Sequence, residues 1–205
     1  MKKLAFDTET SGIDASKHCV LTAYFAVLND NDDIVDELDL KVIPDSGEFQ
    51  WEQGALDVNG INLDEHKESA MSYSEARKLI LDFFKRNSDK KRSLQPCGHN
   101  IDFDIRFITA GLVSLDDWNK YVHYRTIDTM QISSFMKDVD ILPEKVGSLE
   151  SLVEHFGLAK RNAHNAKEDV LMWLDVYKAY KGMFKEMKRG ALSGASESLE
   201  ILLVE

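Results

Sequence analysis

Two carboxylates follow an apolar run near the N-terminus, in the stretch LAFDTETSG at residues 4–12. In a strand, side chains alternate between two faces, so Asp7 and Glu9 lie on the same face as Ala5. Like charges this close repel each other, and a fold that keeps both ionised usually needs a cation between them. The alternative is a strand end whose acids are merely exposed, and the pair taken alone favours this alternative.

A second acidic pair stands in HNIDFDIRF at residues 99–107, where the pattern predicts the start of a helix. Asp102 suits the first turn, because a carboxylate there faces the positive end of the helix dipole. Asp104 lies between Phe103 and Ile105, which must bury part of the helix. Burial of a carboxylate is costly unless it is paired or bound to a metal.

A third stretch, NAHNAKEDV at residues 162–170, combines a helix start with a titratable base. Asn165 is a good N-cap, and Glu168 can complete a capping box. His164 then precedes the cap and Asp169 is the fourth helical residue, two positions that are in contact at many helix starts. The alternative is a capped helix whose histidine and aspartate only hydrogen bond.

Together, the three stretches supply four carboxylates and one imidazole: Asp7, Glu9, Asp104, Asp169 and His164. A ligand set made only of carboxylate oxygens suits Mg²⁺ or Mn²⁺, whereas zinc prefers histidine and cysteine. Two such ions about 4 Å apart can clamp a phosphodiester during hydrolysis. An imidazole, with an ordinary pKa of about 6.5, can take the proton from the attacking water.

The same stretches resemble the three motifs of the DEDD 3′→5′ exonucleases, which have a ribonuclease H-like fold. FDTET, HNIDFDIRF and HNAKED stand in the order of those motifs, and His164 lies five residues before Asp169, as in the DEDDh branch. The sister branch would need tyrosine where this chain has Asn165. ALDVNGI, TIDTMQIS and GSLESLVEHFGL, between the motifs, are also similar to segments of the family, and the resemblance covers residues 2–181.

The resemblance implies roles for individual residues. Asp7, Glu9 and Asp169 would hold a first Mg²⁺ or Mn²⁺ ion, Asp7 and Asp104 a second, and His164 would be the general base. Asp104 is selected over Asp102 because the family pattern has phenylalanine before the acid. The side chains expected to help bind substrate are Thr8, Thr10, His99 and Asn100.

The function implied is a metal-dependent 3′→5′ exonuclease that acts on the 3′ ends of mainly single-stranded DNA, with proofreading during DNA replication as one role. It would release nucleoside 5′-monophosphates. The alternatives are an RNA-processing 3′→5′ exoribonuclease of the same branch and an accessory subunit whose main task is docking a polymerase. A structural or metal-buffering domain does not explain the base beside the fourth acid.

Composition is consistent with this interpretation. The chain has 205 residues, 43% of them hydrophobic and 30% charged, which predicts one folded domain rather than disorder. The net charge of −11 argues against bulk electrostatic binding to nucleic acid, although bound divalent cations would reverse the local sign at an acidic site. Cys19 and Cys97 are expected to be buried free thiols. No apolar run of bilayer length or leader is present, and we expect a cytoplasmic protein.

The elements that must position these residues belong to the α/β class, with a mixed five-stranded sheet flanked by helices. Strands are expected at the opening stretch and at residues 19–28, 34–43, 94–97 and 121–127, with a loop-rich region at 44–72. Helices are expected at residues 73–86, 101–111, 129–136, 148–156 and 166–187.

The C-terminal stretch RGALSGASESLEILLVE, residues 189–205, differs in composition from the rest. Its glycine, serine and alanine content predicts a flexible linker followed by an apolar end. We therefore divide the chain into an exonuclease domain at 1–188 and a tail at 189–205. The tail either packs back onto the domain or binds a partner protein such as a DNA polymerase.

Overall fold

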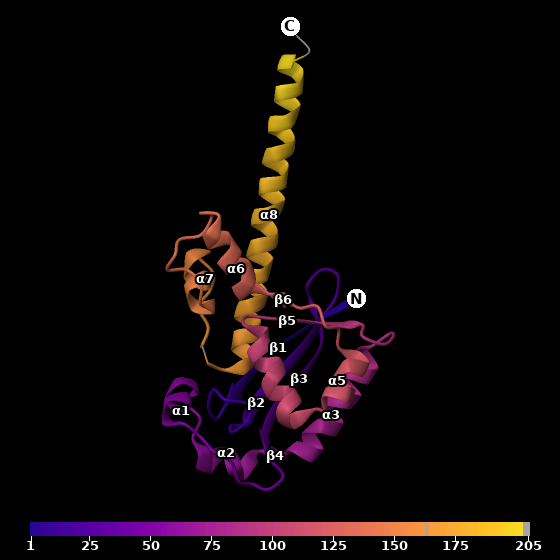
Figure 1. Ribbon diagram of the computed structural model, residues 1–205, viewed down its shortest axis with the longest axis vertical. Coiled ribbons are helices and arrows are strands. Elements are labelled where there is room, and N and C mark those ends of the chain that lie inside the picture. Colours follow the sequence, from indigo (N-terminus) through magenta and orange to yellow (C-terminus); the bar gives the residue numbers. More distant parts are fainter. Residues whose placement is uncertain (163, 203–205) are drawn as a thin grey trace.

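A twisted sheet with helices on both faces forms the body of the protein (Figure 1). The computed structural model describes residues 1–162 and 164–202, with side chains described as far as residue 191. The strands are β1 (Lys2–Thr10), β2 (Val20–Leu28), β3 (Ile34–Ile43), β4 (Met71–Ser72), β5 (Leu94–Gly98) and β6 (Ile127–Asp128), in the order β4-β3-β2-β1-β5-β6. The predicted α/β class is confirmed, and the sheet has six strands rather than five because β4 joins its edge.

The sheet is mixed. β1, β2 and β3 pair antiparallel, whereas β5 pairs parallel to β1, β6 parallel to β5, and β4 parallel to β3. β2 and β3 form a hairpin, and its turn is held by the Asn29 side chain, which accepts the backbone N–H groups of Asn31 and Asp33. Asp32 occupies the left-handed region with φ 64°.

Helices cover both faces of this sheet. They are α1 (Gln53–Asn59), α2 (Leu63–Ser69), α3 (Tyr73–Asn87), α4 (Ile101–Phe107) with the π-helical turn η1 (Ile108–Leu112), α5 (Leu115–Tyr121), α6 (Thr129–Asp138), α7 (Leu149–His155) and α8 (Ala166–Leu202). One face packs on α3, α4, η1 and α5 through a core that includes Phe25, Phe84 and Trp118. The opposite face packs on the first half of α8 through Val170 and Trp173.

Most predicted elements match the structure within a few residues. Ser72 is the N-cap of α3, in a complete capping box with Glu75. The region expected to be only loops contains two seven-residue helices, α1 and α2, and α2 is capped by Asn62. Helices this short are marginal by themselves, which is why periodicity alone did not reveal them.

The strand predicted at residues 121–127 is wrong for most of its length. Tyr121 ends α5, Val122 makes an isolated bridge to Leu94, and the ladder with β5 consists of Ile127 and Asp128. His123 donates one backbone hydrogen bond to Leu94, but its ring then accepts the N–H of Arg125, so the chain turns away before a ladder can form. Local side chain–backbone bonds of this kind compete with strand pairing.

The last helix is longer than predicted. α8 continues past Met187 to Leu202, so the segment expected to be a flexible linker is helical there, and its second half projects from the body (Figure 1). Each glycine in a helix costs about 1 kcal/mol relative to alanine, but the surrounding alanine, leucine, glutamate and lysine residues favour helix. The final residues of the predicted tail, 203–205, lie outside the described part. No helix within the described residues is long and apolar enough to cross a bilayer.

Candidate active site

Strand β1 carries the first two acids to the edge of the core. The predicted alternation holds, because Leu4 and Phe6 lie in the core beneath α3 and α5, whereas Ala5 packs on the other face under α8. Asp7 and Glu9 therefore lie on the α8 side of the strand. The pairing of β1 with β2 shifts register between Glu9 and Thr10, where the regular ladder ends.

Asp104 reaches the same place from helix α4. Its carboxylate is buried, and one oxygen accepts both the backbone N–H of Thr8, at 2.9 Å, and the Thr8 hydroxyl, at 2.7 Å. Asp102, two residues earlier, is exposed. Of the two acids in this motif, it is thus Asp104 that lies in the site, and Thr8 is the residue that holds it.

The start of α4 is anchored by Asp128, a buried residue to which the sequence assigned no role. Its carboxylate accepts the backbone N–H groups of Asn100 at 2.9 Å, Ile101 at 3.2 Å and Met130 at 2.9 Å. Asn100 has a left-handed backbone with φ 60°, which costs energy for a residue other than glycine. An aspartate just before a helical pattern was the available signal, because that residue type is a strong N-cap.

Thr129, the residue after Asp128, contacts His99. The Thr129 hydroxyl lies 3.0 Å from Nδ1 of His99, and burial lowers the pKa of this histidine. His99 and Asn100 thus stand between β5 and α4, at the edge of the acidic cluster. Both were expected to contact substrate.

The N-terminus of α8 contributes the fourth acid and the base. Asn165 caps this helix by accepting the Glu168 backbone N–H at 3.2 Å. In the predicted capping box, the Glu168 side chain would accept the Asn165 backbone N–H. Instead, Glu168 lies 3.7 Å from Arg161. The carboxylate of Asp169 accepts the His164 backbone N–H at 3.1 Å. The exposed imidazole of His164 places Nε2 at 3.8 Å from Glu150 on α7.

These groups line one pocket of about 280 Å³. All predicted site residues except Thr10 contribute to it, and Thr10 lines a neighbouring pocket of about 430 Å³. Sequence reasoning missed Phe103, Ser148, Leu149 and Glu150, which also line the acidic pocket. Ser148, Leu149 and Glu150 come from the start of α7, whose position opposite α4 depends on the tertiary fold.

Burial and mutual repulsion make this a costly place for negative charge. Burial and the charges of Asp104, Asp169 and Glu9 raise the pKa of Asp7 well above its usual range. Burial, followed by the charge of Asp169, raises the pKa of Glu9 to about 7. Burial raises the pKa of Asp169 to about 6, although the neighbouring His164 opposes the shift. The pKa of Asp104 is also raised by burial, against the two Thr8 hydrogen bonds.

This donor set fits a divalent cation. Oxygen atoms of Asp7, Glu9 and Asp169 lie within 4.8 Å of one another, and within the described residues this is the one group of acids or metal-binding side chains so arranged. Asp104 stands outside that group, fixed on Thr8. Carboxylate oxygens are the ligands that hard cations such as Mg²⁺ and Mn²⁺ prefer, and a bound cation would relieve the repulsion.

Comparison with solved structures supports the fold. The chain superposes on Escherichia coli exonuclease I bound to a dT13 oligonucleotide with a TM-score of 0.67 and 17% identity, over 88% of this chain and 41% of that one. For the zinc-bound exonuclease I–ssDNA complex the TM-score is 0.71, with 17% identity over 94% and 43% of the two chains.

Sequence comparison identifies the family. An oligoribonuclease from Mycobacterium avium is 27% identical over 138 residues, which span 64% of this chain and 61% of that protein. The profile of the family described as Exonuclease, RNase_T, matches residues 4–177. The resemblance of the three acidic motifs to those of DEDD 3′→5′ exonucleases is thereby confirmed, and the chain belongs to the Exonuclease (RNase_T) family.

Proposed function

We propose that the protein is a metal-dependent 3′→5′ exonuclease that removes nucleoside 5′-monophosphates from single-stranded 3′ ends of DNA. The observation that carries this proposal is the meeting of four buried or half-buried acids from three separate segments, three of them with oxygen atoms within 4.8 Å. A fold that gathers so much repelling charge requires cations for its working state.

The acids divide into two sets. Asp7, Glu9 and Asp169 would hold one ion, and Asp7 together with Asp104 would hold a second. Two bound Mg²⁺ or Mn²⁺ ions would lower the pKa of the attacking water and stabilise charge on the phosphate and leaving oxygens. Thr8 keeps the Asp104 carboxylate in place, and Asp128 holds the helix on which Asp104 stands.

His164 is the general base in this proposal. Its ring lines the acidic pocket, and its backbone N–H is fixed on Asp169. The imidazole takes the proton of the attacking water while the water oxygen bonds to phosphorus. The bond from phosphorus to the 3′ oxygen of the penultimate nucleotide breaks, that oxygen takes up a proton from solvent, and the terminal nucleotide leaves as a 5′-monophosphate.

The pocket of about 430 Å³ beside the acids has the size and lining for the terminal nucleoside. It shares Thr8, Glu9 and Phe103 with the acidic pocket, and Ile13 and Val58 add exposed apolar surface. Phe103 offers an aromatic face on which a base can stack, an interaction worth about 1–3 kcal/mol. We call this the nucleoside pocket.

DNA is proposed as the main substrate because exonuclease I, solved with single-stranded DNA, aligns with 88–94% of this chain. The second candidate is RNA, which the 27% identity to an oligoribonuclease favours. This chain spans 61% of the length of the oligoribonuclease and 41% of the length of exonuclease I.

Matched DNA and RNA oligonucleotides labelled at either end test the proposal. With Mg²⁺, a 5′-labelled strand should yield a ladder and a 3′-labelled strand should release mononucleotide at once, and EDTA should stop both. Asp7→Ala is expected to be inactive. Intact strands with the wild-type protein, or an Asp7→Ala variant as active as wild type, would refute the proposal, and the ratio of DNA to RNA rates decides the substrate.

A role with a polymerase or another replication protein is a separate proposal, resting on the projecting half of α8. Phe184 and Met187 on this helix are 45% and 46% exposed, a large apolar surface for isolated side chains. Exonuclease I has been solved as an ExoI/SSB-Ct complex, which shows that a nuclease of this fold binds another protein's segment. Truncation after Arg189, combined with Phe184→Ser and Met187→Ser, should weaken association with a purified polymerase and leave the nuclease rate unchanged; unchanged association would exclude this role.

A further inference from the structure

We propose that His18 is a positioning residue that braces two walls of the nucleoside pocket and so sets the affinity for the 3′-terminal nucleotide. The two walls are the loop after β1, residues 11–19, and the segment at the start of α1. The inference rests on the proposed exonuclease function and adds to it a residue outside the acidic motifs.

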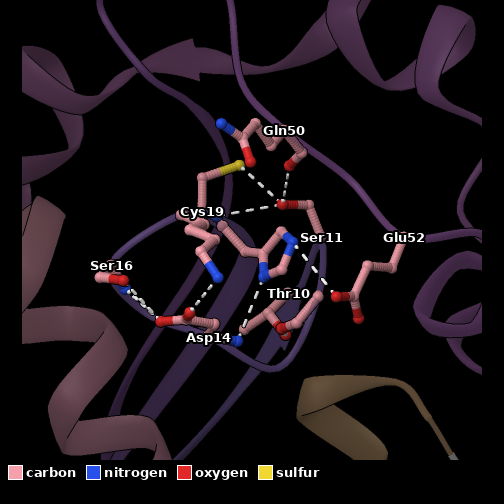
Figure 2. A network of polar contacts seen from close by, with 10 residues as sticks. Thr10, Ser11, Asp14, Ser16, Cys19, Gln50 and Glu52 are labelled. Atoms are coloured by element: carbon pink, nitrogen blue, oxygen red, sulfur yellow. Dashed lines mark hydrogen bonds and ion pairs between the residues drawn. The ribbon is translucent and has the colours of Figure 1, made fainter.

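The His18 ring is almost completely enclosed and is held at both edges. Its side chain is 5% exposed. Nδ1 accepts the backbone N–H of Asp14 at 3.1 Å, so the neutral ring must carry its proton on Nε2. That Nε2 lies 3.5 Å from the Glu52 carboxylate, and the two edges of the ring therefore join the loop to the residue preceding α1 (Figure 2).

Ser11 reinforces the same junction. Its hydroxyl donates to the Gln50 carbonyl at 2.7 Å and accepts the Cys19 N–H at 3.0 Å (Figure 2). Its carbonyl accepts the Glu52 N–H at 2.8 Å. These bonds fix the chain that leads to α1, but none of them uses the Glu52 side chain. The His18 ring is the described group that holds that side chain.

The position of α1 depends on these polar contacts because the helix buries little apolar surface. None of its residues, Gln53–Asn59, is buried, and Glu52 stands at the N-cap without capping the helix by its side chain. At the far end, the Asn59 amide donates to the Thr10 carbonyl at 3.1 Å. Helix α1 is thus tied down at its end by Asn59 and at its start by the Ser11 and His18 contacts.

The His18 ring also supports the other wall of the nucleoside pocket, the loop at residues 11–19. A Cβ atom on Gly12 would come within 2.5 Å of the His18 ring, so the ring packs directly against the Gly12 backbone. Gly12 and Glu52 both line the nucleoside pocket, together with the metal-ligand candidate Glu9. Loss of the ring would loosen both walls and leave the acids of β1, held by the sheet, in place.

Amide variants separate the two edges of the ring. His18→Gln keeps an N–H donor near the Nε2 position, whereas His18→Asn keeps an acceptor near Nδ1 and does not reach Glu52. We expect His18→Asn and His18→Ala to raise KM for a DNA oligonucleotide roughly tenfold, a size typical of the coupling between two residues in contact. His18→Gln and the control Ser16→Ala, whose exposed hydroxyl binds Asp14, should stay within about twofold of wild type.

A small substrate distinguishes positioning from general damage. Bis(4-nitrophenyl) phosphate has a phosphodiester but neither base nor sugar, so its hydrolysis should be unchanged in the His18 variants. The same tenfold loss should appear in the Kd of deoxythymidine 5′-monophosphate with Mg²⁺, measured by titration calorimetry, which requires no turnover.

Each outcome has a definite meaning. Unchanged KM and mononucleotide Kd in a folded His18→Ala variant would overturn the inference, as would an equal fall in hydrolysis of both substrates. A wild-type protein that binds no mononucleotide would also overturn it. A wild-type protein that binds the mononucleotide through His18 but hydrolyses neither substrate would support the inference and refute the exonuclease function.

Discussion

Replacement of Asp7 by asparagine isolates the cost of gathering the acids. Carboxylate oxygens of Asp7, Glu9 and Asp169 lie within 4.8 Å of one another. The charge of Asp104 further raises the pKa of Asp7. Asparagine has nearly the same size and shape as aspartate, so Asp7→Asn removes charge with little change of volume. We expect the variant to be more stable than wild type without metal and to lose most of its stabilisation by Mg²⁺.

The size of the effect follows from the geometry. Two unit charges separated by 4.8 Å repel by about 3 kcal/mol at an effective dielectric constant of about 20. The pKa of Asp7 is raised in the same sense, first by burial and then by the charges of Asp104, Asp169 and Glu9, so part of the cost comes from burial alone. Since only the charge–charge part is removed, we expect a gain of about 2 kcal/mol, or roughly 4–8 °C in Tm.

The pH dependence has a definite sign. The folded-state pKa values of Glu9, about 7, and Asp169, about 6, lie above their ordinary values, so the folded protein binds more protons than the unfolded chain between about pH 4 and 7. The free energy of unfolding contributed by these groups is therefore highest below about pH 4 and falls as the pH rises to about 7. The advantage of Asp7→Asn should accordingly be largest near pH 8 and small near pH 5.

Thermal unfolding followed by circular dichroism, in EDTA or in millimolar Mg²⁺ at both pH values, measures this effect. Asp102→Asn is a matched control, because it removes the same formal charge from an exposed position two residues from Asp104. It should lower stability by no more than about 1 kcal/mol, through loss of a charge at a helix start, and should leave the response to Mg²⁺ unchanged. An Asp7→Asn variant less stable than wild type in EDTA near pH 8 would refute the reasoning.

Three further predictions concern other parts of the molecule. His164→Asn should lower kcat by about 10²–10⁴ and keep the rise of Tm with Mg²⁺, and loss of that rise would place the ring among the metal ligands. Thr8→Val removes the 2.7 Å hydroxyl bond that lowers the pKa of Asp104, so the rising limb of a kcat/KM–pH profile should move to higher pH, and an unmoved limb would contradict this. Asp32→Ala leaves two lysines without the buried carboxylate that they share and should cost about 2–3 kcal/mol in urea unfolding, whereas an unchanged midpoint would show that the bridge adds nothing.

Local sequence determined the features that depend on neighbouring residues. Alternation in β1 predicted that Asp7 and Glu9 share a face with Ala5, because a strand has a period of two whatever it packs against. The Asn165 cap and the Ser72 capping box were predictable for the same reason, since a cap is satisfied within one helical turn. These rules sufficed to propose the acids and the base of the candidate site.

Local rules failed where a distant contact decides the conformation. The β-forming residues at 121–127 predicted a strand, but the turn at His123 leaves an isolated bridge from Val122 to Leu94 and a two-residue ladder at Ile127 and Asp128. The glycine-rich segment after Met187 predicted a linker, yet it continues the helix that the core has already nucleated. Extending a formed helix adds one bond per residue, which is far easier than starting a new one.

Only the tertiary structure decided how the site is held together. Asp104 is fixed by Thr8, which is far from it in the chain, and the left-handed start of its helix is held by Asp128. The His18 ring contacts the Glu52 carboxylate although the two residues belong to separate loops, and no periodicity in the sequence predicts this contact. The sequence by itself thus determined which side chains carry the chemistry, because residue type and local spacing encode that directly. The tertiary structure decided which other groups orient them, because long-range hydrogen bonds arise only when separate segments pack together.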